Sequence, residues 1–232
     1  MKIYRTEQQS QEWLDARRGK VMGSKVKGVR RQSRNSDKRY QTFWDIIGEK
    51  MAIAPDGESP MDRGHRVEPD ALAAAGQILG LKFDLDPGMW ISDLDDDMGV
   101  SPDGAEPVEG EVLPTYGGEV KSLSSGNHLR FIYEDRIARK LPDYNPIDSV
   151  PNEEKHYFRD QVIQYFVINE KLETMYFILH DDRIVVDHLV TYIITIKRSD
   201  IAHLIEDNTN MQFEALMQIN KIVAELSKPI DE

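Results

Sequence analysis

The chain of 232 residues contains no cysteine, which excludes disulfide bonds and cysteine-ligated zinc or iron–sulfur sites. No apolar run approaches the ~18 residues of a membrane span, and residues 1–6 lack the apolar core of a signal peptide. The six histidines show no metal-site spacing, and there is no glycine-rich nucleotide loop. We therefore expect a cytoplasmic protein with no membrane segment and a single domain over residues 1–232.

The charge is unevenly distributed along the chain. A formal net charge of -12 argues against DNA binding, because phosphate contacts need lysine and arginine. Residues 17–39, however, hold ten basic side chains against one acid, whereas residues 83–111 hold ten acids and no base. Such a protein can present one cationic surface to a polyanion. Two merely solvated charge runs are the alternative.

The most informative stretch is Glu119-Val120-Lys121, which follows Asp103 in a Pro-Asp-Gly turn. In a strand, Glu119 and Lys121 emerge on one face while Val120 points to the core. A hairpin over the fifteen intervening residues would bring Asp103 beside Glu119. Two adjacent carboxylates favour a hard cation such as Mg²⁺, which activates water and stabilises a cleaved phosphodiester. Lys121 would orient or deprotonate that water; alternating charges on a solvated strand are the alternative.

Further candidates lie on predicted helices. Ser24 is predicted to cap a helix over residues 24–29, where free amides with Arg17 or Lys25 would bind an anion such as a terminal phosphate. Ordinary capping is the alternative. Glu68, near the start of a helix over residues 61–79, is either exposed or a third carboxylate of the metal site.

Gln161 and Tyr165 share a face of an amphipathic helix predicted over residues 153–169. A buried glutamine needs hydrogen-bond partners, which a water, a phosphate oxygen or Lys121 would supply. A glutamine satisfied at the helix surface is the alternative.

The remaining periodicity predicts an α/β (α+β) class, with a mixed central β-sheet flanked by helices. Helices are expected over residues 6–17, opened by a capping box at Thr6, and over 37–54, 124–141 and 199–226. Strands are expected over residues 81–85, 89–92, 98–101, 116–122, 172–180 and 184–197. The helix over 199–226 is expected to pack its apolar residues, Ile219 and Val223 among them, against the sheet.

Pro-Asp, a spacer and Glu-x-Lys form the motif of the PD-(D/E)xK nucleases. Five motifs in order make the chain resemble one family among them, the phage lambda exonuclease family of YqaJ-type viral recombination nucleases. The motifs are Trp13…Arg17-Arg-Gly-Lys-Val-Met-Gly-Ser24, Arg63-Gly-His-Arg-Val-Glu68-Pro-Asp-Ala71, Gly99-Val-Ser-Pro-Asp103-Gly, Glu119-Val-Lys121 and Gln161-Val-Ile-Gln-Tyr165-Phe-Val-Ile. The similarity runs from about Glu12 to Ile196.

The resemblance implies a restriction-endonuclease-like core and a 5′→3′ exonuclease that digests one strand of linear double-stranded DNA with two Mg²⁺ ions, which Mn²⁺ can replace. By position, the metal ligands would be Asp103, Glu119, the Val120 carbonyl and Glu68. Lys121 would serve the nucleophile and Gln161 would order the site. Arg17 and Ser24, with Lys25 beside them, match the family's 5′-phosphate pocket, and Met61 falls where the family has an apolar wedge.

The resemblance also implies a ring-shaped homotrimer around DNA, and a phage single-strand annealing protein as partner in recombination inside a bacterial host. Ile163 departs from the family pattern, which has a second glutamine there, so Gln161 alone or Gln161 with Gln164 would take that role. The loops over residues 104–118 and 143–152 look longer than in lambda exonuclease. A related nuclease that cuts single strands or acts as an endonuclease, and a DNA-end-binding protein that does not cut, are the alternatives.

Overall fold

A computed structural model of the chain describes residues 10–20, 25, 27–29, 32–33, 38–53, 59–153 and 156–227. The chain divides into two compact units, each built from three segments. Unit 1 comprises residues 1–71, 121–141 and 179–192, and unit 2 comprises residues 72–120, 142–178 and 193–232. Several elements contribute residues to both units. The single domain expected over residues 1–232 stays a prediction.

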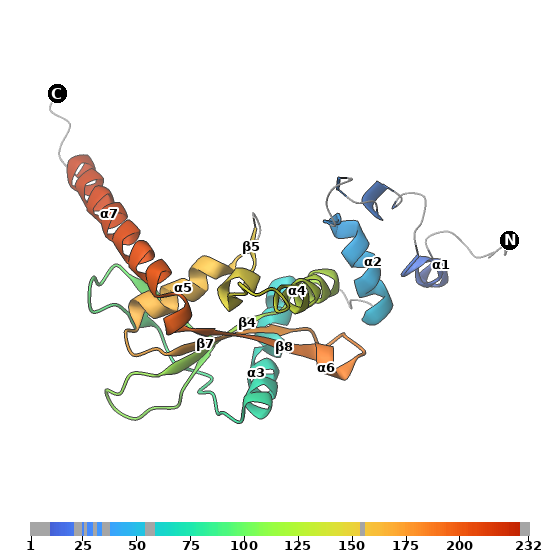
Figure 1. The fold of residues 1–232 in the computed structure, drawn as a ribbon, viewed down its shortest axis with the longest axis horizontal. Helices are drawn as coiled ribbons and strands as arrows, with labels where there is room; N and C mark the ends of the chain where they lie inside the picture. Colours follow the sequence, from blue (N-terminus) through green and yellow to red (C-terminus); the bar gives the residue numbers. More distant parts are fainter. Residues whose placement is uncertain are drawn as a thin grey trace. The chain divides into compact units, whose positions relative to one another are not determined.

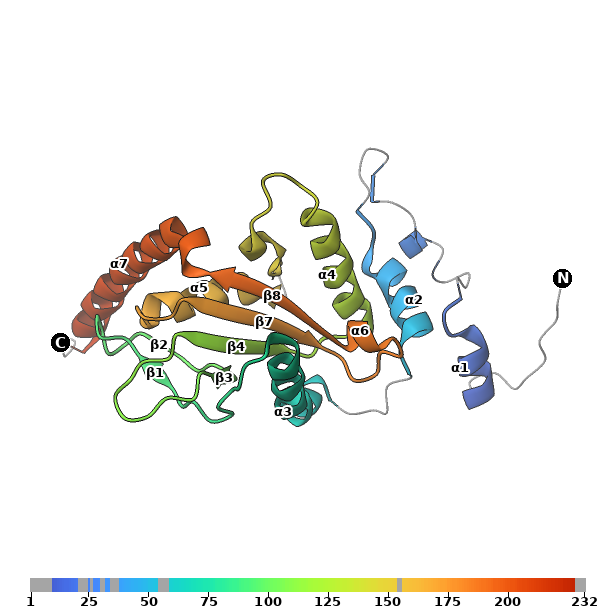
Figure 2. The same cartoon turned by 60° about the horizontal axis from the view of Figure 1, so that its bottom comes forward.

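The central sheet has four strands in the order β3-β4-β7-β8, of which Figure 1 labels β4, β7 and β8. Their bounds are β3 Gly104–Ala105, β4 Tyr116–Lys121, β7 Thr174–His180 and β8 Thr191–Lys197. In unit 2 the helix α5 (Phe158–Ile168) runs beside β7 (Figure 2) and buries Val162, Ile163 and Phe166. Met175, Phe177 and Ile178 of β7 are fully buried as well. The predicted α/β class with a mixed central sheet flanked by helices is confirmed.

Several predicted elements in unit 2 are shorter than expected. The strands expected over 89–92 and 98–101 are each only two residues long, and β1 (Trp90–Ile91) pairs antiparallel with β2 (Gly99–Val100). The strand predicted over 81–85 is wrong: only Asp84 makes a bridge, to Ala105. Turn-forming residues on both sides of these runs, such as Gly88 with φ +69°, limit the pairing.

Two further boundaries were wrong. The helix predicted from residue 153 begins at Phe158, because β5 (Asn152–Glu153) pairs with β6 (His156–Tyr157) before it. The strand predicted from residue 184 begins at Thr191, since the turn of helix α6 (Asp187–Val190) precedes it. Periodicity alone did not distinguish a helix from a strand at these boundaries.

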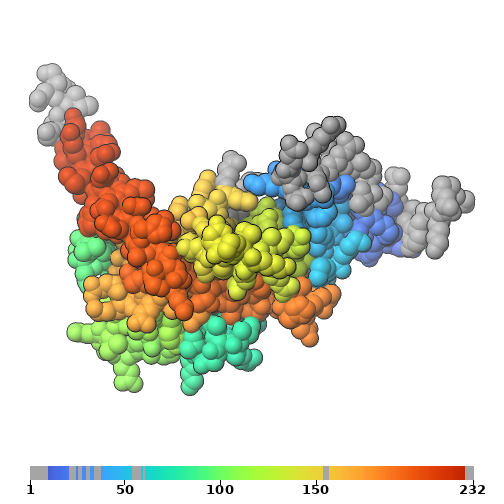
Figure 3. All heavy atoms as spheres, in the orientation of Figure 1, coloured from blue at the N-terminus to red at the C-terminus, as the bar shows by residue number. Residues whose placement is uncertain are grey.

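The last helix of unit 2, α7 (Ala202–Leu226), contradicts the packing expected for it. Its first half lies on α5, where Gln164 Nε2 donates to Gln212 Oε1 over 2.8 Å. Its second half does not pack on the sheet: Ile219 and Val223 are 52% and 55% exposed. In the view of Figure 3 this half stands clear of the other elements of its unit. The helical period was right, but a helix of 25 residues is longer than the surface that covers it.

Unit 1 is mainly helical. It holds α1 (Gln11–Arg17), the 3-10 turn η2 (Lys27–Val29), α2 (Gln41–Met51), α4 (Ser125–Ala138), α6 and the first residues of α3 (Pro60–Leu79). Ser10 Oγ caps α1 by accepting from the Trp13 amide; Thr6 lies outside the described residues. Helices α2 and α4 touch at two glycines, since a Cβ on Gly48 would lie 2.7 Å from the Gly126 nitrogen. No helix in the described part of the chain is long and apolar enough to cross a membrane.

Candidate active site

The two acidic motifs meet on one hairpin in unit 2. Strand β3 pairs antiparallel with β4 in the register Gly104 to Gly118 and Ala105 to Gly117, so that Asp103 comes beside Glu119. Asp103 Oδ2 accepts a hydrogen bond of 2.6 Å from the Val120 amide. A Cβ on Gly104 would lie 2.8 Å from the Leu72 side chain, which explains the small residue beside Asp103. The predicted approach of Asp103 to the Glu119 strand is confirmed.

Tyr165 of α5 contacts one of the two carboxylates, that of Glu119. Its hydroxyl donates a short hydrogen bond to Glu119 Oε2, and the Ser101 carbonyl oxygen lies 3.1 Å from the same hydroxyl. Burial raises the pKa of Tyr165, and the charges of Glu119 and Asp103 raise this pKa further. Both carboxylates therefore lie near enough to act on one hydroxyl, which stays protonated and donates.

Gln161 belongs to the same cluster. Its Nε2 donates to the Tyr165 hydroxyl oxygen over 3.3 Å, so this side chain faces the carboxylates through Tyr165. Gln164 turns instead to Gln212 of α7. The geometry therefore distinguishes the two glutamines that the sequence left open: Gln161 is the one that lies beside the carboxylate pair.

Sequence reasoning placed Tyr165 on the same helix face as Gln161 but missed its contact with Glu119. The side chain is fully buried, and the Trp90 ring packs edge-on against it with ring centroids 6.2 Å apart. The four-residue spacing from Gln161 was the available signal. It showed a shared helix face but could not show which strand the face meets.

The oxygen atoms of this cluster suit a hard cation. Glu119 is only 1% exposed, and a buried carboxylate is costly without a positive charge or donors around it. Two neighbouring carboxylates offer oxygen ligands of the kind that Mg²⁺ prefers. Within the described residues no three acidic or histidine side chains are gathered into a metal-binding group. The cluster in unit 2 thus supplies two of the three predicted carboxylates.

The other predicted catalytic residues belong to unit 1. Lys121 ends β4 and is partly exposed, and Glu68 is partly exposed on α3. Met61 in the first turn of α3 is 68% exposed, as an apolar wedge would need to be. These residues are described within unit 1 and the carboxylate cluster within unit 2. The metal and catalytic roles assigned to them stay predictions.

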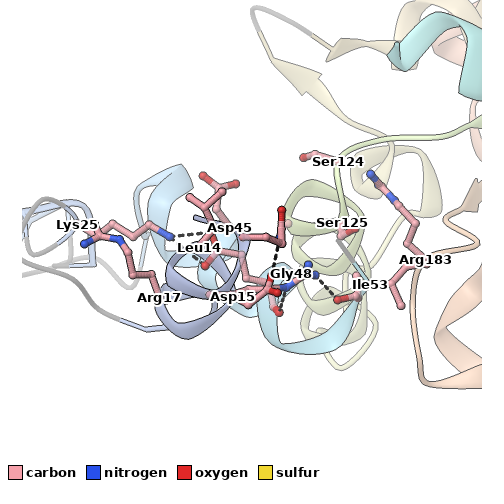
Figure 4. Close-up of a pocket in the computed structure, with 15 residues that line it drawn as sticks. Leu14, Asp15, Arg17, Lys25, Asp45, Gly48, Ile53, Ser124, Ser125 and Arg183 are labelled. Atoms are coloured by element: carbon pink, nitrogen blue, oxygen red, sulfur yellow. Dashed lines mark hydrogen bonds and ion pairs between the residues drawn. The ribbon is translucent and has the colours of Figure 1, made fainter. Parts of the chain in front are cut away.

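Unit 1 also contains a cavity of about 450 Å³ that carries the predicted anion-binding residues (Figure 4). Arg17 and Lys25 line one side, and Ser124, Ser125 and Arg183 line the other. The residues at the start of α4 therefore line the same cavity as several cationic side chains. Ser24 lies outside the described residues.

Lys25 and Arg17 already have partners in this cavity. Lys25 Nζ lies 2.7 and 2.9 Å from the two carboxylate oxygens of Glu49, and the Gly19 amide donates to Glu49 Oε2 over 2.8 Å. Partial burial acts to raise the pKa of Glu49, but the hydrogen bond from Lys25 and that amide outweigh it and lower the pKa. The Arg17 guanidinium lies 4.1 Å from the centre of the Trp13 ring.

A family model described as the YqaJ-like viral recombinase domain matches residues 12–169, which is more than half of the chain. No curated protein sequence matches the chain. Among solved structures, an alkaline exonuclease (LHK-Exo) from Laribacter hongkongensis is similar at 21% identity and a TM-score of 0.48, over 94% of this chain and all of the other. The same enzyme in complex with dAMP gives the same values.

Proposed function

The chain belongs to the YqaJ-like viral recombinase family, and from this membership we propose that it is a metal-dependent exonuclease that digests one strand of linear double-stranded DNA in the 5′→3′ direction. The observation that carries the proposal is that Asp103 and Glu119 lie side by side on the β3–β4 hairpin, where Asp103 accepts from the Val120 amide and Glu119 accepts from the Tyr165 hydroxyl. A protein that only binds DNA gains nothing from a carboxylate pair, because carboxylates repel phosphate.

Two Mg²⁺ ions, or Mn²⁺ in their place, are the proposed cofactors. Asp103, Glu119 and the Val120 carbonyl would hold one ion, and Glu68 would hold the second or its waters. When bound, such ions supply a water of lowered pKa and positive charge for the phosphate that is cut. The oxygen-only chemistry of these donors supports this assignment.

The protein residues would prepare the attack. Lys121 would orient the attacking water or accept its proton, since it emerges from the strand that carries Glu119. Gln161 would act through Tyr165, whose hydroxyl it contacts, and so fix the orientation of Glu119. This is the role of a positioning residue.

The cavity of unit 1 is the proposed 5′-phosphate pocket. Arg17, Lys25 and Ser24 would bind the terminal phosphate, and the first residues of α4, which line the cavity, would add amide donors. The phosphate would compete with Glu49 for Lys25, because both anions need the same ammonium group. Met61, exposed at the start of α3, would part the terminal base pair.

For the assembly we propose a ring-shaped homotrimer around the duplex, which works with a phage single-strand annealing protein in the cytoplasm of a bacterial host. Family membership supports this proposal. Sedimentation of the purified protein with and without linear DNA would measure the number of copies.

The direct test of the reaction uses end-labelled linear and circular duplexes of one sequence with Mg²⁺. We expect loss of the linear DNA only, and no digestion by Asp103→Asn or Lys121→Ala. Asp93→Asn is the matched control, because Asp93 is an exposed acid in a turn of the same unit. Cutting of the circle would identify an endonuclease, and full activity of Asp103→Asn would remove the proposed site.

The pocket has a test of its own. Linear DNA with 5′-phosphate ends should be digested faster than DNA with 5′-hydroxyl ends, and Arg17→Ala should remove the difference. Equal rates in the unaltered protein would mean that the terminal phosphate binds elsewhere or not at all.

A further inference from the structure

Three charged side chains enclose the turn that follows Lys121 in unit 1. Arg63 Nη2 donates to the carbonyl oxygens of Ser122 and Leu123 over 3.0 and 2.6 Å. Arg183 Nη2 donates to the same Leu123 carbonyl over 3.0 Å. The turn between the end of β4 and the start of α4 is therefore held by arginines that lie about sixty residues away on either side.

Asp181 extends this network to the first residue of α4. Its Oδ1 accepts from Arg183 Nε over 2.7 Å, and its Oδ2 accepts from Arg183 Nη2 over 3.0 Å and from Ser125 Oγ over 2.6 Å. Burial acts to raise the pKa of Asp181, but the hydrogen bonds from Arg183 and Ser125 outweigh it and lower the pKa. The carboxylate is thus kept ionised between its two partners.

These groups are buried far more than surface ion pairs are. Asp181 is 0% exposed and Arg63 is 6% exposed. Burying charges is costly and stabilises a fold only where the geometry is good, so such networks are weak evidence for stability alone. What a satisfied buried network does supply is a fixed arrangement of the groups it contacts.

We propose that Arg63, Asp181 and Arg183 are positioning residues that hold Lys121 and the first turn of α4 as one rigid piece. Ser124, Ser125 and Arg183 line the cavity that contains Arg17 and Lys25, so the network sets the distance from the 5′-phosphate pocket to the lysine. This inference rests on the proposed function. That distance fixes how many nucleotides lie between the bound 5′ end and the bond that is cut.

The test needs variants that loosen the network without removing a catalytic group. Arg183→Lys keeps the charge but cannot donate to Asp181 and Leu123 in the same fork geometry. Asp181→Asn keeps the shape and loses the charge, and Ser125→Ala removes only one hydroxyl. A misplacement of about 1 Å can cost about 10²-fold in rate, so we expect a fall in kcat of about that size for Arg183→Lys and Asp181→Asn, and a smaller one for Ser125→Ala.

The matched control is an ion pair between the helix that carries Arg63 and the turn that carries Asp181. Arg66 Nη1 and Asp182 Oδ2 form an ion pair of 2.9 Å one helical turn from Arg63 and one residue from Asp181, with side chains 49% and 36% exposed. Asp182→Asn should leave kcat, the preference for 5′-phosphate ends and the product lengths as they are in the unaltered protein.

The decisive readouts are kcat, the ratio of rates on 5′-phosphate and 5′-hydroxyl ends, and the length distribution of the products, all at a temperature where each variant is folded by circular dichroism. We expect the network variants to lower kcat and the ratio of rates on the two kinds of end, and to broaden the length distribution of the products. Should Asp181→Asn fail to fold, Arg183→Lys and Ser125→Ala carry the test. Unchanged kcat and product lengths in these variants, with Lys121→Ala inactive, would overturn the inference, whereas an active Lys121→Ala would overturn the proposed function itself.

Discussion

Tyr165→Phe is the substitution that best tests the carboxylate cluster. It removes one hydroxyl and leaves the ring, so no cavity forms and the contact with Trp90 stays. Glu119 loses a hydrogen-bond donor while only 1% of it is exposed to water. A hydrogen bond to a charged group contributes about 1.5–3 kcal/mol, so we expect the free energy of unfolding to fall by about that amount without metal.

The same change should affect metal binding more than the fold. Groups that orient a metal ligand typically change affinity or activity by about 10–100-fold when they are removed. Tyr165→Phe should therefore shift the Mg²⁺ concentration at half-maximal digestion upwards by about 10–100-fold. Saturating Mg²⁺ should restore much of the rate, because the carboxylates themselves are still present.

The assay is digestion of linear duplex over a Mg²⁺ titration, with denaturant unfolding of the same samples. Tyr116→Phe is the control, since the Tyr116 hydroxyl donates to the Lys82 carbonyl over 2.7 Å at the other end of β4. A Mg²⁺ curve for Tyr165→Phe that superimposes on that of Tyr116→Phe would refute the argument that Tyr165 orients Glu119.

Three further predictions concern other parts of the chain. Burial lowers the pKa of His128 below its ordinary 6.5, and its Nδ1 has no hydrogen-bond partner among the described residues. The unfolded chain then binds more protons than the folded chain at acidic pH, so the free energy of unfolding should be full above pH 6.5 and fall as the pH is lowered. Unfolding measured across this range should show a steeper fall for the unaltered protein than for His128→Gln. Glu49→Gln should free Lys25 of its ion pair and strengthen binding of 5′-phosphate ends in a fluorescence competition assay; weaker binding would mean that Glu49 mainly holds Lys25 in place. Ile219→Gln on the exposed half of α7 should change the unfolding free energy by no more than about 0.5 kcal/mol, whereas Ile178→Ala in the buried strand β7 should cost about 2–5 kcal/mol; equal costs would show that α7 is covered in solution.

Local patterns were enough to predict the hairpin at the centre of the site. A strand alternates with period two, and a Pro-Asp-Gly turn ends the strand before it, so the approach of Asp103 to Glu119 followed from the sequence. The helices α2, α3 and α4 were also predictable, because each carries an apolar stripe over several turns. Their ends differed by a few residues, where capping decides and periodicity does not.

The contacts that complete the site could not be predicted in the same way. Arg63 and Arg183 meet at the Leu123 carbonyl from positions sixty residues away in each direction. No periodicity connects such positions, and a backbone carbonyl leaves no trace in the sequence. Tyr165 was visible as a neighbour of Gln161, but its contact with Glu119 depends on which face of α5 lies against the sheet.

The acidity of this chain is compatible with its proposed action on DNA, because buried carboxylates in it have hydrogen-bond donors beside them. Each of two buried carboxylates has a donor beside it, Tyr165 for Glu119 and Arg183 for Asp181. Burial raises the pKa of Tyr165, which favours the protonated hydroxyl that donates to Glu119. Glu119 therefore has a hydrogen-bond donor fixed beside it before a cation arrives. A site arranged in advance saves reorganisation during the reaction, which is where electrostatic catalysis gains most.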